Sequence, residues 1–189
     1  MCELDSFNPV ETTEHARIAN LRDKYVFWDI DGTLAPYRFN NHVADPDGTN
    51  NGMSLKEIED GVFLYRKPSK LMQRVVSECE ARENIIMGHC QVQKEMQDKQ
   101  IWLDKYYPMI KERLLVYVDK SKADTILDYC AEHEIDLQDV VYVDDVIPFL
   151  REAERKGITS YHISSFLDWS YQFAGEVCDS CFGAHVSRS

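Results

Sequence analysis

The fold of this chain is decided by Tyr25-Val26-Phe27-Trp28-Asp29-Ile30-Asp31-Gly32-Thr33-Leu34. The apolar run predicts a strand, which ends in two aspartates spaced i, i+2 and then a glycine. Burying unpaired carboxylates is costly, so two of them at the end of an apolar strand require a cation or a proton. Residues two apart on a strand point to the same side, and Gly32 permits a tight turn. The pair is therefore expected at the carboxyl end of the strand, where open α/β sheets bind ligands.

This stretch resembles the first motif of the haloacid dehalogenase (HAD) superfamily in its phosphatase branch, which reads strand, Asp, any residue, Asp, Gly, Thr. Asp29 through Thr33 match this motif completely. An isolated Asp-x-Asp is a weak signal, because paired acids also cap helices or lie in solvated turns. The apolar residues before it and Gly-Thr-Leu after it favour the catalytic interpretation over an acidic turn without chemistry.

Length and charge limit the classes of protein to consider. The chain has 189 residues, which suits a single domain over 1–189 with a substantial core. Acidic residues outnumber basic ones 33 to 21, and the net charge of -12 disfavours nucleic acid polymers and anionic membranes as partners. There is no apolar run long enough for a membrane span, and the acidic start lacks the pattern of a secretory leader. We expect a cytoplasmic protein.

The cysteines favour reduced thiols. Six of them are scattered along a chain that is large enough to fold without disulfides. Cys178 and Cys181 form one Cys-x-x-Cys pair, with His185 nearby. A structural zinc site usually needs four ligands, so we interpret the pair as coincidental.

Residues 35–67 interrupt the regular alternation of the chain and are rich in Asn, Asp and Gly. We interpret them as a small cap insertion after the first strand. Within it, residues 45–52 are similar to a calcium loop, but Asn50 and Lys56 stand where an EF-hand has its glycine and glutamate. A solvated turn is the better interpretation of that segment.

The rest of the chain alternates between helices and strands. Apolar periodicity predicts helices beginning at Pro68, near Val92, at Ser121 and at Pro148, and strands at 84–87, 113–118, 140–143 and 158–163. Gly88-His89-Cys90 is expected to end the strand at 84–87. This alternation predicts an α/β fold, a Rossmann-like parallel sheet of about five strands flanked by helices.

Asp144 and Asp145 directly follow the strand at 140–143. Because parallel strands point the same way, these acids should reach the same edge of the sheet as Asp29 and Asp31. Converging carboxylates suit Mg²⁺, a hard cation that also accepts substrate phosphate as a ligand. The paired acids resemble the fourth HAD motif in its Asp-Asp form.

The resemblance implies roles for these acids. Asp29 would be the nucleophile and a magnesium ligand, forming an aspartyl phosphate. Asp31 would give its backbone carbonyl to the metal and serve as acid and base through its side chain, for which a raised pKa is expected. We favour Asp144 as the direct metal ligand over Asp145, which would be a further ligand or lie just outside the ligands.

The third HAD motif is a lysine near the start of the helix before the fourth strand. Lys122 fits this position, one residue after the expected cap Ser121, and Lys120 is the alternative. The lysine would offset the negative charge of the phosphate and the nucleophile.

The second motif departs from the family pattern. The family has Ser or Thr at the end of the second strand, where this chain has Gly88 followed by His89. The Gly88 backbone N–H or the His89 side chain would then have to bind the phosphate oxygen. Losing a hydrogen bond to a charged group lowers the rate by about 10- to 150-fold, which weakens an enzyme without abolishing it.

Taken together, these motifs imply a Mg²⁺-dependent phosphoric monoester hydrolase. The substrate class is a small phosphorylated metabolite or a nucleotide, and the chain is loosely similar to the deoxyribonucleotidase branch of the superfamily. The alternative is a non-catalytic HAD-fold module that binds metal or phosphate, prompted by the missing hydroxyl of the second motif. The identity of the substrate and the oligomeric state stay open.

Overall fold

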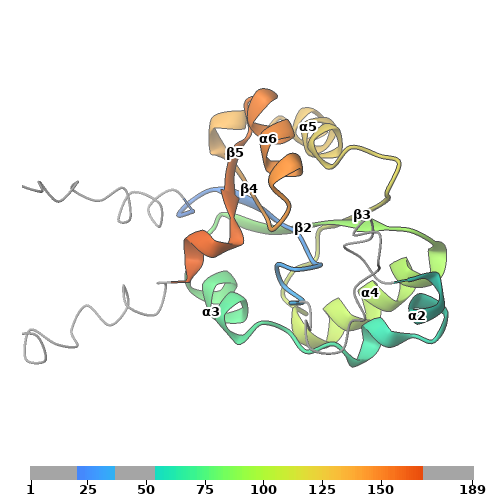
Figure 1. The fold of residues 1–189 in the computed structure, drawn as a ribbon. Coiled ribbons are helices and arrows are strands. Elements are labelled where there is room, and N and C mark those ends of the chain that lie inside the picture. Colours follow the sequence, from blue (N-terminus) through green and yellow to red (C-terminus); the bar gives the residue numbers. More distant parts are fainter. Residues whose placement is uncertain (1–20, 37–53, 168–189) are drawn as a thin grey trace, which may run out of the picture.

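A computed structural model describes residues 21–36 and 54–167. Its centre is a five-stranded sheet with the strand order β3-β2-β1-β4-β5, in which every neighbouring pair is parallel (Figure 1). The strands are β1 (Tyr25–Trp28), β2 (Glu83–Cys90), β3 (Arg113–Tyr117), β4 (Val140–Asp144) and β5 (Thr159–His162). The predicted α/β fold with a five-stranded parallel sheet is confirmed.

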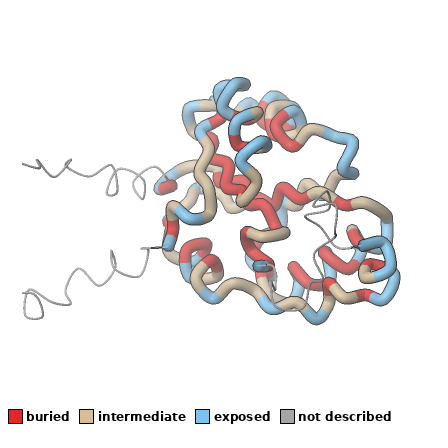
Figure 2. The backbone as a smooth tube through the Cα atoms, in the orientation of Figure 1, coloured by how far each residue is buried: buried red, intermediate tan, exposed pale blue. Residues whose placement is uncertain are grey.

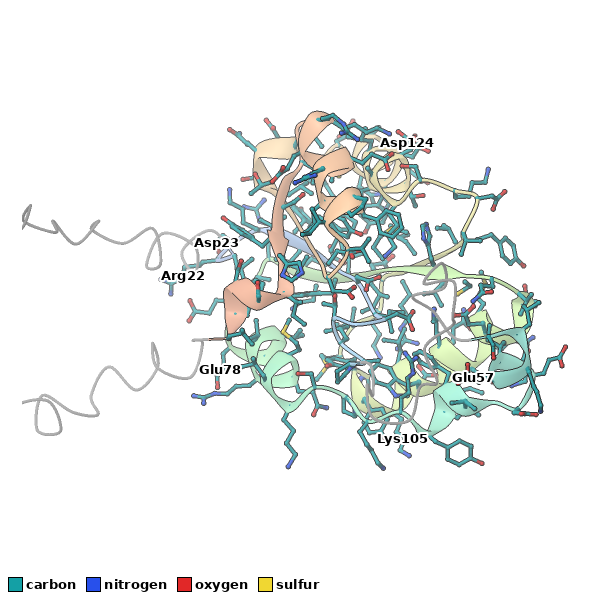
Figure 3. All side chains as sticks on the ribbon, in the orientation of Figure 1. Arg22, Asp23, Glu57, Glu78, Lys105 and Asp124 are labelled. Carbon is teal, nitrogen blue, oxygen red and sulfur yellow. The ribbon has the colours of Figure 1, made fainter. Side chains whose placement is uncertain are left out.

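Helices cover both faces of the sheet (Figure 1). One face carries α3 (Lys70–Glu78) and α4 (Gln93–Tyr106), and the other carries α5 (Lys122–Glu132) and α6 (Ile147–Arg155). The short helix α2 (Leu55–Glu59) and a 3-10 turn, Val62–Tyr65, contact α4. Two further 3-10 turns are Leu137–Asp139 and Ile163–Phe166. Asp124 on α5 and Lys105 on α4 lie on opposite sides of the sheet (Figure 3).

The alternation of side chains along β1 divides the core into two layers. Val26 and Trp28 pack with the residues of α3 and α4, whereas Phe27 packs with those of α5 and α6. The buried residues of Figure 2 therefore follow the strands and the inward sides of the helices. Because β1 is central and both its faces are covered, the residue that follows it is held at the middle of the carboxyl edge.

Serine caps fix where several helices begin. The hydroxyl oxygen of Ser69 accepts a hydrogen bond from the Met72 N–H, so α3 begins at Lys70, two residues after Pro68. The Ser121 hydroxyl likewise accepts from the Asp124 N–H at 3.1 Å. This cap makes Lys122 the first residue of α5, as the sequence predicted.

The prediction that β2 ends at Met87 is wrong. Gly88, His89 and Cys90 continue the strand and pair in register with Leu115, Val116 and Tyr117 of β3. Glycine weakens a strand but does not break it when a neighbouring strand supplies the hydrogen bonds.

Some predictions concern residues outside the described ranges. They are the calcium-like loop at 45–52 and the pair Cys178 and Cys181. In the part of the chain that the structure does describe, Cys79, Cys90 and Cys130 are buried free thiols. None of the helices there is both long and apolar enough to cross a membrane.

Candidate active site

The carboxyl edge of the sheet brings together Asp29, Asp144 and Lys122. Asp29 follows β1, and its N–H donates to the Val143 carbonyl at 2.9 Å. The Lys122 ammonium bonds one carboxylate oxygen of Asp29 and lies 2.8 Å from Oδ2 of Asp144. The exposed fractions of the residues, 2% for Asp29, 4% for Lys122 and 0% for Asp144, show that these charges are buried against one another. Of the two lysines considered, Lys122 is the one at the acids, whereas Lys120 is exposed.

Asp144 is held by several donors at once. Its Oδ1 accepts the Val146 N–H at 2.7 Å, and its Oδ2 accepts the Tyr142 hydroxyl as well as Lys122. Tyr142 was not identified from the sequence, although it lies two residues before Asp144 and so points to the same side of β4. These bonds fix the orientation of the Asp144 carboxylate.

Asp145 completes a group of three acids. One carboxylate oxygen each from Asp29, Asp144 and Asp145 lie within 4.8 Å of one another. Oδ1 of Asp145 is buried and has no hydrogen-bond partner among the described residues. Buried polar atoms are nearly always paired, so an orphaned carboxylate oxygen here fits a bound cation.

Gly32 makes room for Asp145. A Cβ atom at position 32 would lie 2.1 Å from Oδ2 of Asp145, and the backbone of Gly32 has φ +83°. Both facts require glycine, because other residues rarely adopt this φ and a side chain would displace the carboxylate.

Gly32→Ala is therefore expected to weaken Mg²⁺ binding by tenfold or more, about 1.4 kcal/mol, and to lower the melting temperature. Calorimetric titration and thermal unfolding would measure the two effects. Gly157→Ala is the matched control, since Gly157 has φ +86° but its Cβ would lie 4.0 Å from the nearest side chain atom. The control should lose stability and keep its Mg²⁺ affinity; equal affinities in both variants would contradict this role of Gly32.

Asp31 does not join the acids at Lys122. Its Oδ1 lies 2.9 Å from Nη1 of Arg66, and its Oδ2 lies 2.6 Å from Nζ of Lys99. Burial opposes ionisation of Asp31, but Lys99 and Arg66 outweigh it and hold the pKa below its ordinary value. The raised pKa expected for Asp31 is therefore wrong, because the sequence did not reveal these two cations.

At Asp29 and Asp145 the effect of burial on the pKa is not outweighed by nearby cations. Burial first, and then the neighbouring Asp144, raise the pKa of Asp29 well above its ordinary value, against the opposing effect of Lys122. The same two causes raise the pKa of Asp145 to about 6. Three carboxylates are thus crowded around one ammonium group, and ionising all of them is unfavourable without further positive charge.

This crowding predicts that Mg²⁺ stabilises the protein more at neutral than at acidic pH. The pKa of Asp145 is about 6 in the folded protein and about 4 in the unfolded chain. Protonation of Asp145 therefore stabilises the metal-free fold below about pH 4, and this stabilisation is lost as the pH rises through about 6. Mg²⁺ held by these acids would require their ionised form, so the rise in melting temperature on adding Mg²⁺ should be larger at about pH 7.5 than at about pH 5. Thermal unfolding at both pH values checks this. Asp145→Asn should abolish the difference, and equal shifts in the parent protein would contradict it.

His89 points to the same face of the sheet as Asp29. Its ring makes a T-shaped contact with Phe149, and its Nε2 lies 2.8 Å from the carbonyl oxygen of Lys120. A carbonyl only accepts, so Nε2 carries the hydrogen and Nδ1 of the neutral ring is an acceptor. Burial and then Lys122 lower the pKa of His89, which favours the neutral ring. In this state the remaining nitrogen of His89 has no hydrogen to donate to a phosphate oxygen.

Gly88 lies inside β2 and faces the other layer of the core. A Cβ atom at position 88 would lie 2.8 Å from Cδ1 of Ile30 and 3.1 Å from Cδ2 of Leu115. A serine hydroxyl at this position would point toward apolar side chains instead of toward Asp29 and Lys122. Adding one is therefore not expected to provide a hydrogen bond to a phosphate beside Asp29.

No family model matches this chain, and no curated protein matches it. Among solved structures, it is similar to the N-terminal part of the protein BF1531 from Bacteroides fragilis, containing a phosphatase domain complexed with Mg, with a TM-score of 0.45 and 16% identity. That match covers 83% of this chain but only 41% of the other. A hypothetical protein from Xanthomonas campestris, XCC2798, matches with a TM-score of 0.42 and 14% identity over 95% of this chain and 97% of its own. Similarities of this strength do not establish a family, so the function has to be inferred from the residues of this chain.

Proposed function

We propose that this protein is a Mg²⁺-dependent phosphatase that hydrolyses small phosphate monoesters with Asp29 as the nucleophile. The observation that carries the proposal is the buried contact of Lys122 with Asp29 and Asp144, next to the orphaned oxygen of Asp145. A purely structural ion pair needs no third acid. Here a third acid is added, and glycine at position 32 leaves space for it.

The charges of the site favour a divalent cation. Three carboxylates, Asp29, Asp144 and Asp145, face one ammonium group, so the fully ionised site carries an excess of negative charge that a divalent cation would neutralise. These acids, together with the backbone carbonyl of Asp31, would hold Mg²⁺. When bound, Mg²⁺ supplies positive charge that stabilises the phosphoryl oxygens during transfer.

Lys122 is suited to bind the phosphate. An ammonium group has three hydrogens to donate, and Lys122 uses two of them on Asp29 and Asp144. Among the described residues no oxygen or nitrogen accepts the third, although the ammonium also lies 5.0 Å from the centroid of the Phe149 ring. A phosphate oxygen beside Asp29 would accept the third hydrogen in a charge-assisted hydrogen bond. Lys122 would then provide the phosphate contact that the Ser or Thr of the second HAD motif makes.

The reaction then proceeds in two steps. An oxygen of the Asp29 carboxylate forms a bond to phosphorus, and the bond from phosphorus to the ester oxygen breaks; the ester oxygen keeps the bonding electron pair and takes a proton from solvent water to leave as the alcohol. In the second step a water molecule attacks phosphorus and releases Asp29 and inorganic phosphate. Asp31, kept ionised by Lys99 and Arg66, is suited to accept the proton of that water.

The insertion reaches this site through Arg66. The Trp102 N–H donates to the Arg66 carbonyl at 3.0 Å, and the rings of Phe63 and Trp102 pack edge to face. The end of the insertion is thus fixed on α4 beside Asp31. This contact of the described residues 54–67 supports the proposal that the insertion, residues 35–67, is a small cap over a small phosphorylated metabolite or nucleotide.

A screen of phosphorylated metabolites with and without Mg²⁺ tests the proposal, with phosphate release as the readout and Asp29→Asn as the blank. We expect release from at least one class of monoester, abolished by a chelator. A non-catalytic module would instead bind Mg²⁺ or phosphate without turnover. Release that never exceeds the Asp29→Asn blank would overturn the proposed function.

A further inference from the structure

Lys99 is a fully buried lysine on α4, with 0% of its surface exposed. Its ammonium lies 2.6 Å from Oδ2 of Asp31 and 2.7 Å from Oε1 of Glu95, and it donates to the His89 carbonyl. A buried charge is tolerated only when it is paired and hydrogen-bonded. These three acceptors match the three hydrogens of the ammonium group.

The three acceptors come from three different segments. Asp31 lies in the turn after β1, the His89 carbonyl lies near the end of β2, and Glu95 lies in the first turn of α4. The second oxygen of Glu95 accepts the Gln91 N–H at 2.6 Å. Lys99 therefore joins the turn that carries Asp31 to the end of β2 and to the start of α4.

Arg66 holds Asp31 from the opposite side. Lys99 bonds Oδ2 and Arg66 bonds Oδ1, so each carboxylate oxygen has its own cation. Arg66 also lies over the Phe63 ring, with 5.2 Å from its guanidinium carbon to the ring centroid. The Asp31 side chain is thereby fixed in one orientation by α4 and by the end of the insertion.

Lys99 differs from Lys122 in the number of ammonium hydrogens that remain available to a substrate. Lys122 keeps one hydrogen for a substrate oxygen, whereas every hydrogen of Lys99 has a partner within the protein. Lys99 is also bonded to Asp31, and not to the three acids that could hold a metal. Substrate binding and metal replacement are therefore poor explanations for a buried lysine at this place.

We propose that Lys99, supported by Arg66, is a positioning residue that holds the Asp31 carboxylate where it can accept a proton from the attacking water. The proposal rests on the phosphatase function proposed above. Its consequence is selective: losing Lys99 should slow the chemical steps while leaving the binding of substrate and metal nearly intact.

The first experiment compares the kinetics of variants in which the buried Glu95 is replaced, so that no buried carboxylate loses its cation. Lys99→Met alone would leave Glu95 without its cation, so Lys99→Met is combined with Glu95→Gln and compared with Glu95→Gln alone. The expected result is a kcat lower by about 10- to 150-fold, the value of one charge-assisted hydrogen bond. KM and the Mg²⁺ dissociation constant should change by less than about threefold.

Lys94→Met combined with Asp98→Asn is the matched control, because Lys94→Met alone would leave the buried Asp98 without its cation. Lys94 is on the same helix and pairs with Asp98, four residues later, as Lys99 pairs with Glu95, four residues earlier; 44% of the Lys94 side chain is exposed. Its loss should leave kcat and KM unchanged. An equal loss of kcat in both lysine variants would show a general effect on α4 and overturn the positioning role.

The second experiment does not depend on activity. Asp31→Asn and Lys99→Met are combined in a double-mutant cycle of melting temperatures in the Glu95→Gln background. If the two side chains interact, the double variant should lose less than the sum of the single losses, by more than about 2 °C. Additive losses of melting temperature would show that Asp31 and Lys99 do not interact. Coupled losses of melting temperature together with an unchanged kcat for the Lys99→Met variant would show that the pair only stabilises the fold, and would overturn the positioning role. A parent protein without Mg²⁺-dependent turnover in the metabolite screen would instead overturn the proposed function, and the positioning role with it.

Discussion

Asp29→Asn is expected to abolish phosphate release, lowering kcat by at least about 1,000-fold. The amide keeps the shape of the side chain but cannot form the aspartyl phosphate. Lys122 retains Asp144 as a partner, so the variant should still fold. Burial raises the pKa of Asp29, and replacing a carboxyl that is costly to ionise should not lower the melting temperature strongly.

Phosphate release and acid-quenched trapping of phosphorylated protein would measure this effect. Asp139→Asn is a suitable control, because Asp139 lies before β4 at the other edge of the sheet and pairs with Lys24. It should turn over substrate like the parent. Turnover by Asp29→Asn comparable to the parent would show that another group attacks phosphorus.

The sequence was informative where a residue's place depends on its own strand or helix. Val26 to Trp28 had to be a buried strand, and the parallel arrangement then brought Asp29 and Asp144 to one edge. The cap at Ser121 determined where α5 begins, and with it the place of Lys122. Local signals of this kind rest on periodicity and capping, which need no knowledge of the rest of the fold.

The surroundings of Asp31 could not be predicted in this way. Its partners Arg66 and Lys99 are 35 and 68 positions away along the chain, and their contacts depend on how α4 and the insertion pack. One signal was present: Glu95, Lys99 and Trp102 follow one another at helical spacing on the buried side of α4. Charged residues on an otherwise apolar face indicate a buried ion pair, and this is where Lys99 could have been found.

At the end of β2 a local signal, the glycine at position 88, gave a wrong prediction. Because glycine often ends a strand, the sequence predicts a break at Gly88 and places Gly88 at the position that faces the phosphate. Its pairing with Leu115 of β3 keeps the strand going, and the strand alternation then places Gly88 and His89 on opposite faces. Such a shift of one residue changes which side chain reaches the site, and only the sheet register decides it.

Lys122→Met is expected to destabilise the fold and to remove most of the activity. Without the ammonium, Asp29 and Asp144 remain buried side by side with no cation, and breaking a buried ion pair costs about 3–5 kcal/mol. For a domain of this size that corresponds to a fall in melting temperature of roughly 10 °C. The loss of one donor to the phosphate should lower kcat by about 100-fold or more. Thermal unfolding and steady-state kinetics would measure the two effects.

The destabilisation of Lys122→Met should also depend on conditions. Both Mg²⁺ and acidic pH relieve the repulsion, the first by adding positive charge and the second by protonating a carboxyl whose pKa burial has raised. The loss in melting temperature should therefore shrink on adding Mg²⁺ and again on lowering the pH from about 7.5 to about 5. Lys120→Met removes an exposed lysine two residues earlier and should change neither stability nor kcat. A Lys122→Met protein as stable and active as this control would mean that Asp29 and Asp144 do not need Lys122, and both its structural and its proposed catalytic role would be lost.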